Sequence, residues 1–170
     1  ADEIVTYHRG AAIGNAAASI VGKQINYDFT RAADGALTTQ VQALPNGYGL
    51  EWGDQLTPWQ RTDTAATNGT SLDGTAASTF GAQAWLHVYA FTGTDVTIKI
   101  QDSANDSSFT DVTGLGFTAV TAAPFSQRLA TASGATIRRY LRVATTTSGG
   151  VTSVTFAVHL TRNLVVAPAF

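Results

Sequence analysis

The stretch Trp85-Leu86-His87-Val88-Tyr89-Ala90 decides the fold class, because apolar side chains recur at every second position. Leu86, Val88 and Ala90 form one face, and Trp85, His87 and Tyr89 form the other. A period of two is that of a β-strand with one face on a core and one face toward water. We therefore expect this stretch to be a strand of an all-β protein.

The same alternation recurs downstream in three segments, residues 96–101, 137–143 and 154–161. Glycine, asparagine and serine pairs, which favour turns, separate these segments. Several short strands with turn signals between them are typical of a β-sandwich, either immunoglobulin-like or jelly-roll-like. We assign residues 79–170 to this sandwich, and we find no segment with a helical period.

Upstream, residues 3–8, 18–27 and 37–43 also alternate and predict strands. We assign residues 1–58 to part of a second β domain. Because the chain enters a strand at once, we expect a fragment that starts inside a domain. Residues 28–35 are predicted to be a loop because they end in Asp34-Gly35, a turn signal. Residues 59–78 are small, polar and aperiodic, which predicts a linker or an extended arm.

The composition excludes several classes of protein. Of 170 residues, 44% are hydrophobic and only 13% are charged, with a net charge of −2, which does not suit a disordered chain. A basic footprint for gripping nucleic acid is absent from the sequence. There is no cysteine, so neither disulfides nor thiolate metal sites are expected, and no apolar run is long enough for a membrane-spanning helix.

Motifs for catalysis are also absent: there is no nucleophile elbow and no phosphate-binding glycine loop. We expect no enzyme activity and no cofactor. The histidines, His8, His87 and His159, lack metal-ligand spacing along a strand. We expect ordinary surface histidines, with His87 and His159 on solvent-facing sides of strands, while an approach across strands stays open as the alternative.

One turn carries oxygen-bearing side chains of the kind that calcium binds, at Asp102, Asn105, Asp106 and Asp111. Their spacing matches no calcium loop, and the same residues are the common ones in turns. We therefore expect no metal site and keep calcium as the alternative.

Aromatic and basic side chains supply the candidate contact residues. Trp85 and Tyr89 lie opposite the apolar face of their strand, so they would contact sugar rings or another subunit. The alternative is that they form a second small core beneath the linker.

Arg138, Tyr140 and Arg142 share a face that would bind anions or glycans or would keep the surface soluble. Arg139 is expected to point inward. Tyr48, Trp52 and Trp59 lie at the predicted junction and are candidate contacts between subunits.

Taken in order, several segments resemble the latter part of the major tail (tail tube) proteins of long-tailed phages that infect actinobacteria. They are residues 5–10, 21–28, 46–53, 61–63, 67–70, 90–104 and 138–143. The resemblance covers nearly the whole chain, although no single motif is diagnostic. The N-terminal strands and the long loop of that family are missing here.

The resemblance implies a virion structural protein, made in the cytoplasm of the host bacterium. Six copies would form rings that stack into a tube and contact other tail proteins. Double-stranded DNA would pass through the lumen without specific binding, which suits a mildly acidic chain. The sandwich would project outward, with weak contact to host glycans, and no membrane is involved. The alternative is a carbohydrate-binding or cell-surface-binding β-sandwich module of a phage virion.

Overall fold

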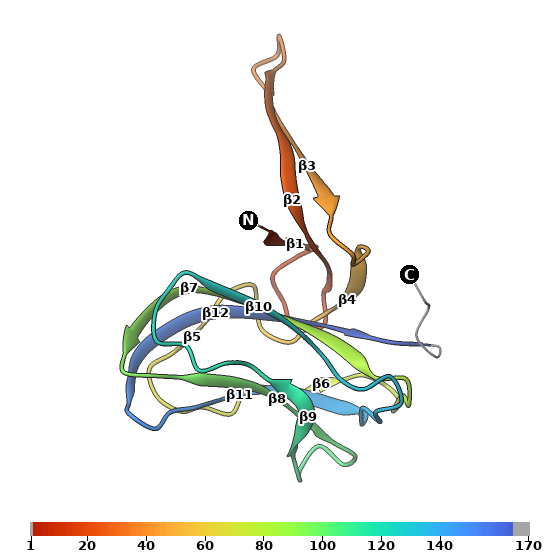
Figure 1. Cartoon of the computed structure of the whole chain (residues 1–170), viewed down its shortest axis with the longest axis vertical. Coiled ribbons are helices and arrows are strands. Elements are labelled where there is room, and N and C mark those ends of the chain that lie inside the picture. The colour runs from red at the N-terminus through yellow and green to blue at the C-terminus, as the bar shows by residue number, and fades with distance from the viewer. Residues whose placement is uncertain (1, 165–170) are drawn as a thin grey trace.

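The computed structural model describes residues 2–164, apart from the side chain of Tyr27, and within that range it contains strands and no helix (Figure 1). The expectation of an all-β protein is thus confirmed. The strands are β1 (Glu3–His8), β2 (Ala16–Arg31), β3 (Leu37–Pro45), β4 (Glu51–Gln55), β5 (Arg61–Asp63), β6 (Leu72–Asp73), β7 (Ala82–Gly93), β8 (Thr97–Ser103), β9 (Thr110–Gly116), β10 (Phe125–Ala130), β11 (Tyr140–Thr146) and β12 (Val151–Arg162).

Two antiparallel sheets form a β-sandwich, as the sequence predicts. The larger sheet has the order β1-β2-β4-β12-β7-β10, with β3 paired to β2 and β5 paired to β12. The smaller sheet has the order β6-β11-β8-β9. The sandwich proper consists of β7, β10 and β12 facing the smaller sheet, and β1 to β4 extend the larger sheet beyond it (Figure 1).

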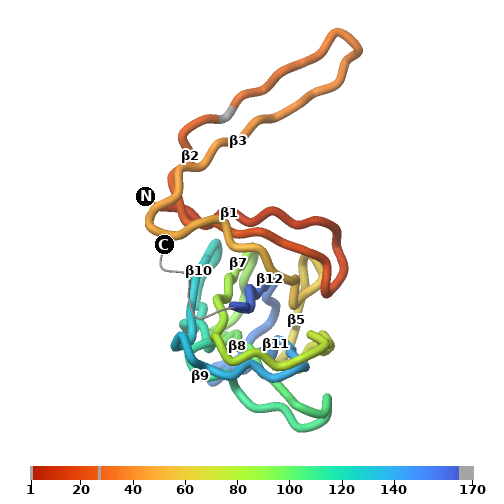
Figure 2. The backbone as a smooth tube through the Cα atoms, turned by 90° about the vertical axis from the view of Figure 1, so that its right-hand side faces the viewer, coloured from red at the N-terminus to blue at the C-terminus, as the bar shows by residue number. Residues whose placement is uncertain are grey.

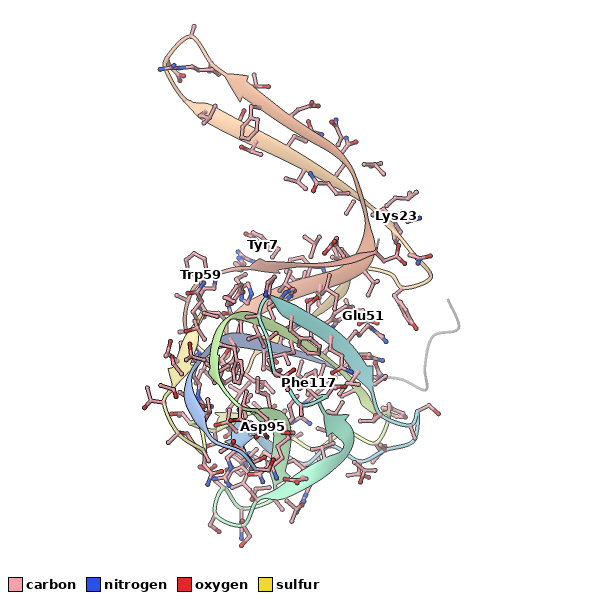
Figure 3. The ribbon with its side chains drawn as sticks, turned by 60° about the vertical axis from the view of Figure 1, so that its left-hand side comes forward. Tyr7, Lys23, Glu51, Trp59, Asp95 and Phe117 are labelled. Carbon is pink, nitrogen blue, oxygen red and sulfur yellow. The ribbon has the colours of Figure 1, made fainter. Side chains whose placement is uncertain are left out.

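The main core lies between the sheets and is built from the apolar faces of their strands. Leu86 and Phe156 come from the larger sheet, Ile100 and Val143 come from the smaller one, and all four are fully buried. Phe117, which follows β9, fills the same layer (Figure 3). Burying one such side chain contributes about 1.5–3 kcal/mol, so this layer stabilises the sandwich.

The N-terminal strands join the larger sheet through β4. Leu160 of β12 pairs with Asp54, and Ala18 of β2 pairs with Trp52. A Cβ atom at Gly53 would collide with the carbonyl group of Leu160, so this close approach requires glycine. The sheet therefore continues across residue 58, where the sequence suggested a domain boundary.

Strands β2 and β3 form a long hairpin that projects away from the sandwich (Figures 1 and 2). The predicted loop at residues 28–35 is wrong for its first half, because β2 continues to Arg31. Phe29 and Thr30, both good strand formers, pair there with residues of β3. The turn signal at Asp34-Gly35 does mark the tip, where the Ala32 N–H donates to the Ala36 carbonyl over 2.8 Å.

Residues 59–78 are extended, as predicted, but they do not form a free linker. β5 pairs with β12, and β6 pairs with β11. Asp63 is buried and accepts from Arg61 (2.7 Å) and from the Thr145 hydroxyl group (2.8 Å). This pairing ties the segment to the edges of both sheets.

Candidate functional site

The projecting hairpin has two chemically different faces. Residues directly opposite each other on an antiparallel ribbon point to the same side. Phe29 pairs with Thr39, and Leu37 pairs with Arg31, on one side. Val41 lies on this side too, because strand side chains alternate, so this side, the apolar hairpin face, carries Phe29, Leu37 and Val41.

The opposite side is polar along the same length. It carries Asn26 opposite Gln42, Asp28 opposite Gln40, and Thr30 opposite Thr38. An amphipathic ribbon normally lays its apolar side on a core, as strands with one solvated face do. Here the apolar side chains remain half exposed or more: Phe29 is 58% exposed, Val41 50% and Leu37 66%.

Exposed apolar surface is concentrated in the same part of the chain. Within residues 2–164, all the exposed large apolar residues except Tyr89 and Leu164 lie between Val5 and Trp59. Where exposed apolar side chains gather on one face, as they do on the hairpin, they mark a candidate interaction site. In addition, β3 pairs only with β2 among the described strands, so its other edge offers unpaired backbone groups for a further strand.

A second apolar area lies on the outer surface of β1 and β4. Tyr7 and Trp52 contact each other edge to face, with ring centroids 6.4 Å apart, and each is more than half exposed. Trp59 lies near Tyr7, across a hollow lined also by Thr6 and His8 (Figure 3). Trp52 and Trp59 are both exposed, and their role as contacts between subunits stays a prediction.

The histidines do not lie on open surface, and this prediction is wrong. The N-terminal strands cover the outer face of β7 and β12. There the Ser19 hydroxyl group is 2.7 Å from His159 Nδ1, and the Thr6 hydroxyl group is 2.8 Å from His87 Nε2. The two hydroxyl groups are also hydrogen-bonded to each other, at 2.7 Å. The alternative, approach across strands, describes the arrangement better.

Burial sets the protonation of this cluster. It lowers the pKa of His159 to about 3 and the pKa of His87 to about 4, and the nearby His8 ring adds to both shifts. Both imidazoles are therefore neutral near neutral pH and serve as hydrogen-bonding spacers between the layers. Among the described residues, no group of three or more metal-binding side chains has the arrangement needed to hold an ion.

Trp85 is likewise fully buried, so its predicted surface contact is wrong. It lies on the face of β7 away from the main core, and the N-terminal strands, rather than the linker of the alternative interpretation, lie over this face. Tyr89, four residues further along the same face, is 42% exposed and stacks on His87 with an interplanar angle of 14°. The end of β7 that carries Tyr89 leaves this face partly open.

A hollow of about 410 Å³ lies where the loop before β4 meets β7, β10 and the end of β12. Arg128 forms its base: its guanidinium group is 2.7 Å from Glu51, 4.1 Å from the centre of the Tyr48 ring and 5.0 Å from the centre of the Trp85 ring. Tyr48 and Trp52 stand at its walls, and both are about half exposed. Sequence reasoning missed Arg128 and Gln83, because neither belongs to a pattern along the chain.

The basic face predicted on β11 is held by partners within the chain. Asp102 binds Arg138 at 2.6 Å, Gln101 accepts from Arg142 at 2.8 Å, and the Arg142 guanidinium group covers the Phe109 ring. Arg139 covers the Tyr140 ring. Arg139 points outward rather than inward, as an exposed ion pair with Asp73 at 2.6 Å. These contacts favour a charged face stabilised by the sandwich over an open anion site.

The oxygens proposed for calcium are also occupied by protein donors. Asn105 accepts from the Ser103 hydroxyl group and from the backbone of Ser107 and Ser108, as a turn residue does. Asp111 accepts from Lys99 and Gln101. Asn105 and Asp111 are therefore bonded to separate sets of protein donors, and the contacts of Asn105 support the turn interpretation.

Comparison with known proteins gives little further help. No protein-family model matches the chain, and no curated protein matches it. Among solved structures, the chain is similar to the CBM22-1 xylan-binding domain of Paenibacillus barcinonensis Xyn10C, at 13% identity and a TM-score of 0.34, over 96% of this chain and 97% of that one. A likeness this low carries no argument about function. Within residues 2–164, no helix has the length and apolar character needed to span a membrane.

Proposed function

We propose that this chain is a non-catalytic structural subunit that associates with copies of itself through the apolar hairpin face. The observation that supports this most is the hairpin itself: an amphipathic two-stranded ribbon that stands clear of the molecule with its apolar side uncovered. A lone two-stranded hairpin is marginal in water. Packing against another copy would bury Phe29, Leu37 and Val41 and complete the sheet at the open edge of β3.

The type of subunit follows from the resemblance to tail tube proteins. In a ring of copies, neighbouring hairpins would lie side by side, with their apolar faces on protein and their polar faces on the lumen. A lumen lined by Asn26, Asp28, Gln40 and Gln42 would let DNA slide, because none of these side chains is cationic and phosphate affinity depends on Lys and Arg. We therefore propose a tail-tube role in a phage virion, with rings that are hexameric in the family the chain resembles.

Mass measurement by light scattering, over a range of concentrations, tests this proposal. The variant carries Phe29→Ser, Leu37→Ser and Val41→Thr together, and it should remain a folded monomer while the natural chain forms oligomers. The matched control carries Thr38→Ser and Gln40→Ser on the polar face and should associate as the natural chain does. A natural chain that stays monomeric at every concentration would contradict the proposal.

The second candidate is the carbohydrate-binding virion module. The observation that favours it is the hollow beside Tyr48 and Trp52, where half-exposed rings adjoin hydrogen-bonding groups. This function does not require self-association, so a monomeric chain that binds sugar would select it over the tail-tube role.

A further inference from the structure

We infer that the hollow at the loop before β4 is a binding site for one ring of a neutral carbohydrate. This inference rests on the second candidate function and deepens it, because it names the class of ligand and the residues that would hold it, at a site away from the hairpin. The site is named the Tyr48 hollow after its most prominent ring. It is formed by Tyr48, Trp52, Glu51, Gln83, Arg128 and Asn163.

The charges of the Tyr48 hollow exclude an ionic ligand. Arg128 is held by Glu51 at 2.7 Å, and both side chains are largely buried, at 13% and 20% exposure. Because each charge already has its counter-ion at short range, an anion would have to displace Glu51 and a cation would have to displace Arg128. A neutral ligand leaves this pair in place.

The aromatic walls suit the apolar side of a sugar ring. Tyr48 is 47% exposed and Trp52 is 52% exposed, so each presents ring surface that can be covered. The C–H groups on one side of a sugar ring pack on aromatic rings, while its hydroxyl groups remain free to hydrogen-bond. Stacking of Arg128 against Tyr48, at 4.1 Å, holds the tyrosine ring in position before any ligand arrives.

A polar atom in the lining lacks a partner that a sugar hydroxyl group would supply. Gln83 Oε1 is buried and has no hydrogen-bond partner within the described chain, although buried polar groups in proteins are almost always paired. Asn163 is held in place by donating from Nδ2 to the Phe80 carbonyl over 2.9 Å. A hydroxyl group that donates to Gln83 would remove the desolvation cost of leaving that oxygen unpaired.

Tryptophan fluorescence and nuclear magnetic resonance titration of the full chain test this site. The probes are D-glucose, D-galactose, N-acetylglucosamine and cellohexaose. Binding of single sugars in the millimolar range, with shifts centred on residues 47–52 and 83, is the expected result. Tighter binding of cellohexaose would identify a polymer as the natural source, and equal binding would identify a single ring. Absence of binding by all four probes would overturn the inference.

Variants separate the site from other aromatic surface. Trp52→Ala should lower the affinity about tenfold, since one ring contact is lost, and Trp59→Ala, which removes an equally exposed ring elsewhere, should leave it unchanged. Gln83→Leu should lower the affinity while leaving thermal stability equal or higher, because the unpaired oxygen is removed. Loss of affinity in Trp59→Ala alone would overturn the assignment. Self-association is read separately by light scattering, so either proposal can fail without the other.

Discussion

At the scale of single residues, the least predictable feature is what covers the second face of β7. Alternation correctly separates Leu86 and Val88 from Trp85 and His87. However, alternation does not say whether the second face meets water. That depends on Thr6 and Ser19, which lie far away in the sequence and come to rest over this face. Burial of Trp85 and the histidines was therefore missed, while the main core was predicted well.

The buried histidines predict a pH-dependent stability. Because burial lowers the pKa values of His87 and His159 to about 4 and about 3, the unfolded chain binds more protons than the folded one below about pH 6.5. Stability should be full above that value and should fall as the pH drops toward 4, by up to about 1.4 kcal/mol per pH unit for each histidine.

Thermal unfolding between pH 7.5 and pH 4.5 measures this effect. The variant His159→Gln should show a shallower fall in melting temperature than the natural chain, since one titrating group is gone. An equally steep fall in the variant would show that the carboxylates, rather than this histidine, cause the acid sensitivity.

The buried ion pair of β5, between Arg61 and Asp63, should be among the polar sites where a substitution destabilises the fold most. Asp63 is only 4% exposed and holds both Arg61 and Thr145. Replacing Asp63 by Ala would leave the Arg61 guanidinium group buried without its counter-ion, and should cost about 3–5 kcal/mol in urea unfolding. Asp73→Ala is the matched control: its pair with Arg139 is nearly half exposed, so solvent screens the interaction and the loss should be much smaller. Equal losses would contradict the buried role of Asp63.

At the scale of elements, strand existence could be predicted more reliably than strand length. The period of two in residues 18–27 and 37–43 correctly indicates both arms of the hairpin. The end of β2 was missed because Asp28 is a common turn residue and Asp34-Gly35 is a turn signal, yet β2 continues to Arg31 along an exposed ribbon. Residues 59–78 were missed as sheet edges because β5 and β6 are too short, at three and two residues, to show any period.

Amide hydrogen exchange tests the hairpin as an element. In dilute monomer, amides of residues 26–31 and 37–42 should exchange fast, because few apolar contacts cover them, whereas amides of β7 and β12 should be strongly protected. At concentrations where the chain associates, the hairpin amides should slow markedly and those of the main core should change little. Hairpin amides that remain fast in the oligomer would place the contact surface elsewhere, for example on Tyr7 and Trp52.

At the scale of the whole molecule, the protein combines a sandwich that has a well-buried core with an N-terminal part that leaves large apolar side chains exposed. The sandwich buries its apolar residues, whereas residues 5–59 hold nearly all the large apolar side chains left exposed among the described ones. This asymmetry is expected of a subunit that folds alone and whose exposed apolar side chains are covered only in an assembly. If the proposed assembly role holds, the functional features are faces rather than catalytic groups, which carry no motif along the sequence.

The most direct test of the central claim is electron microscopy of the concentrated natural chain beside the variant with Phe29→Ser, Leu37→Ser and Val41→Thr. We predict closed rings or tubes of identical subunits for the natural chain and isolated particles for the variant. Isolated particles for both, at the highest concentration reached, would contradict assembly through the hairpin.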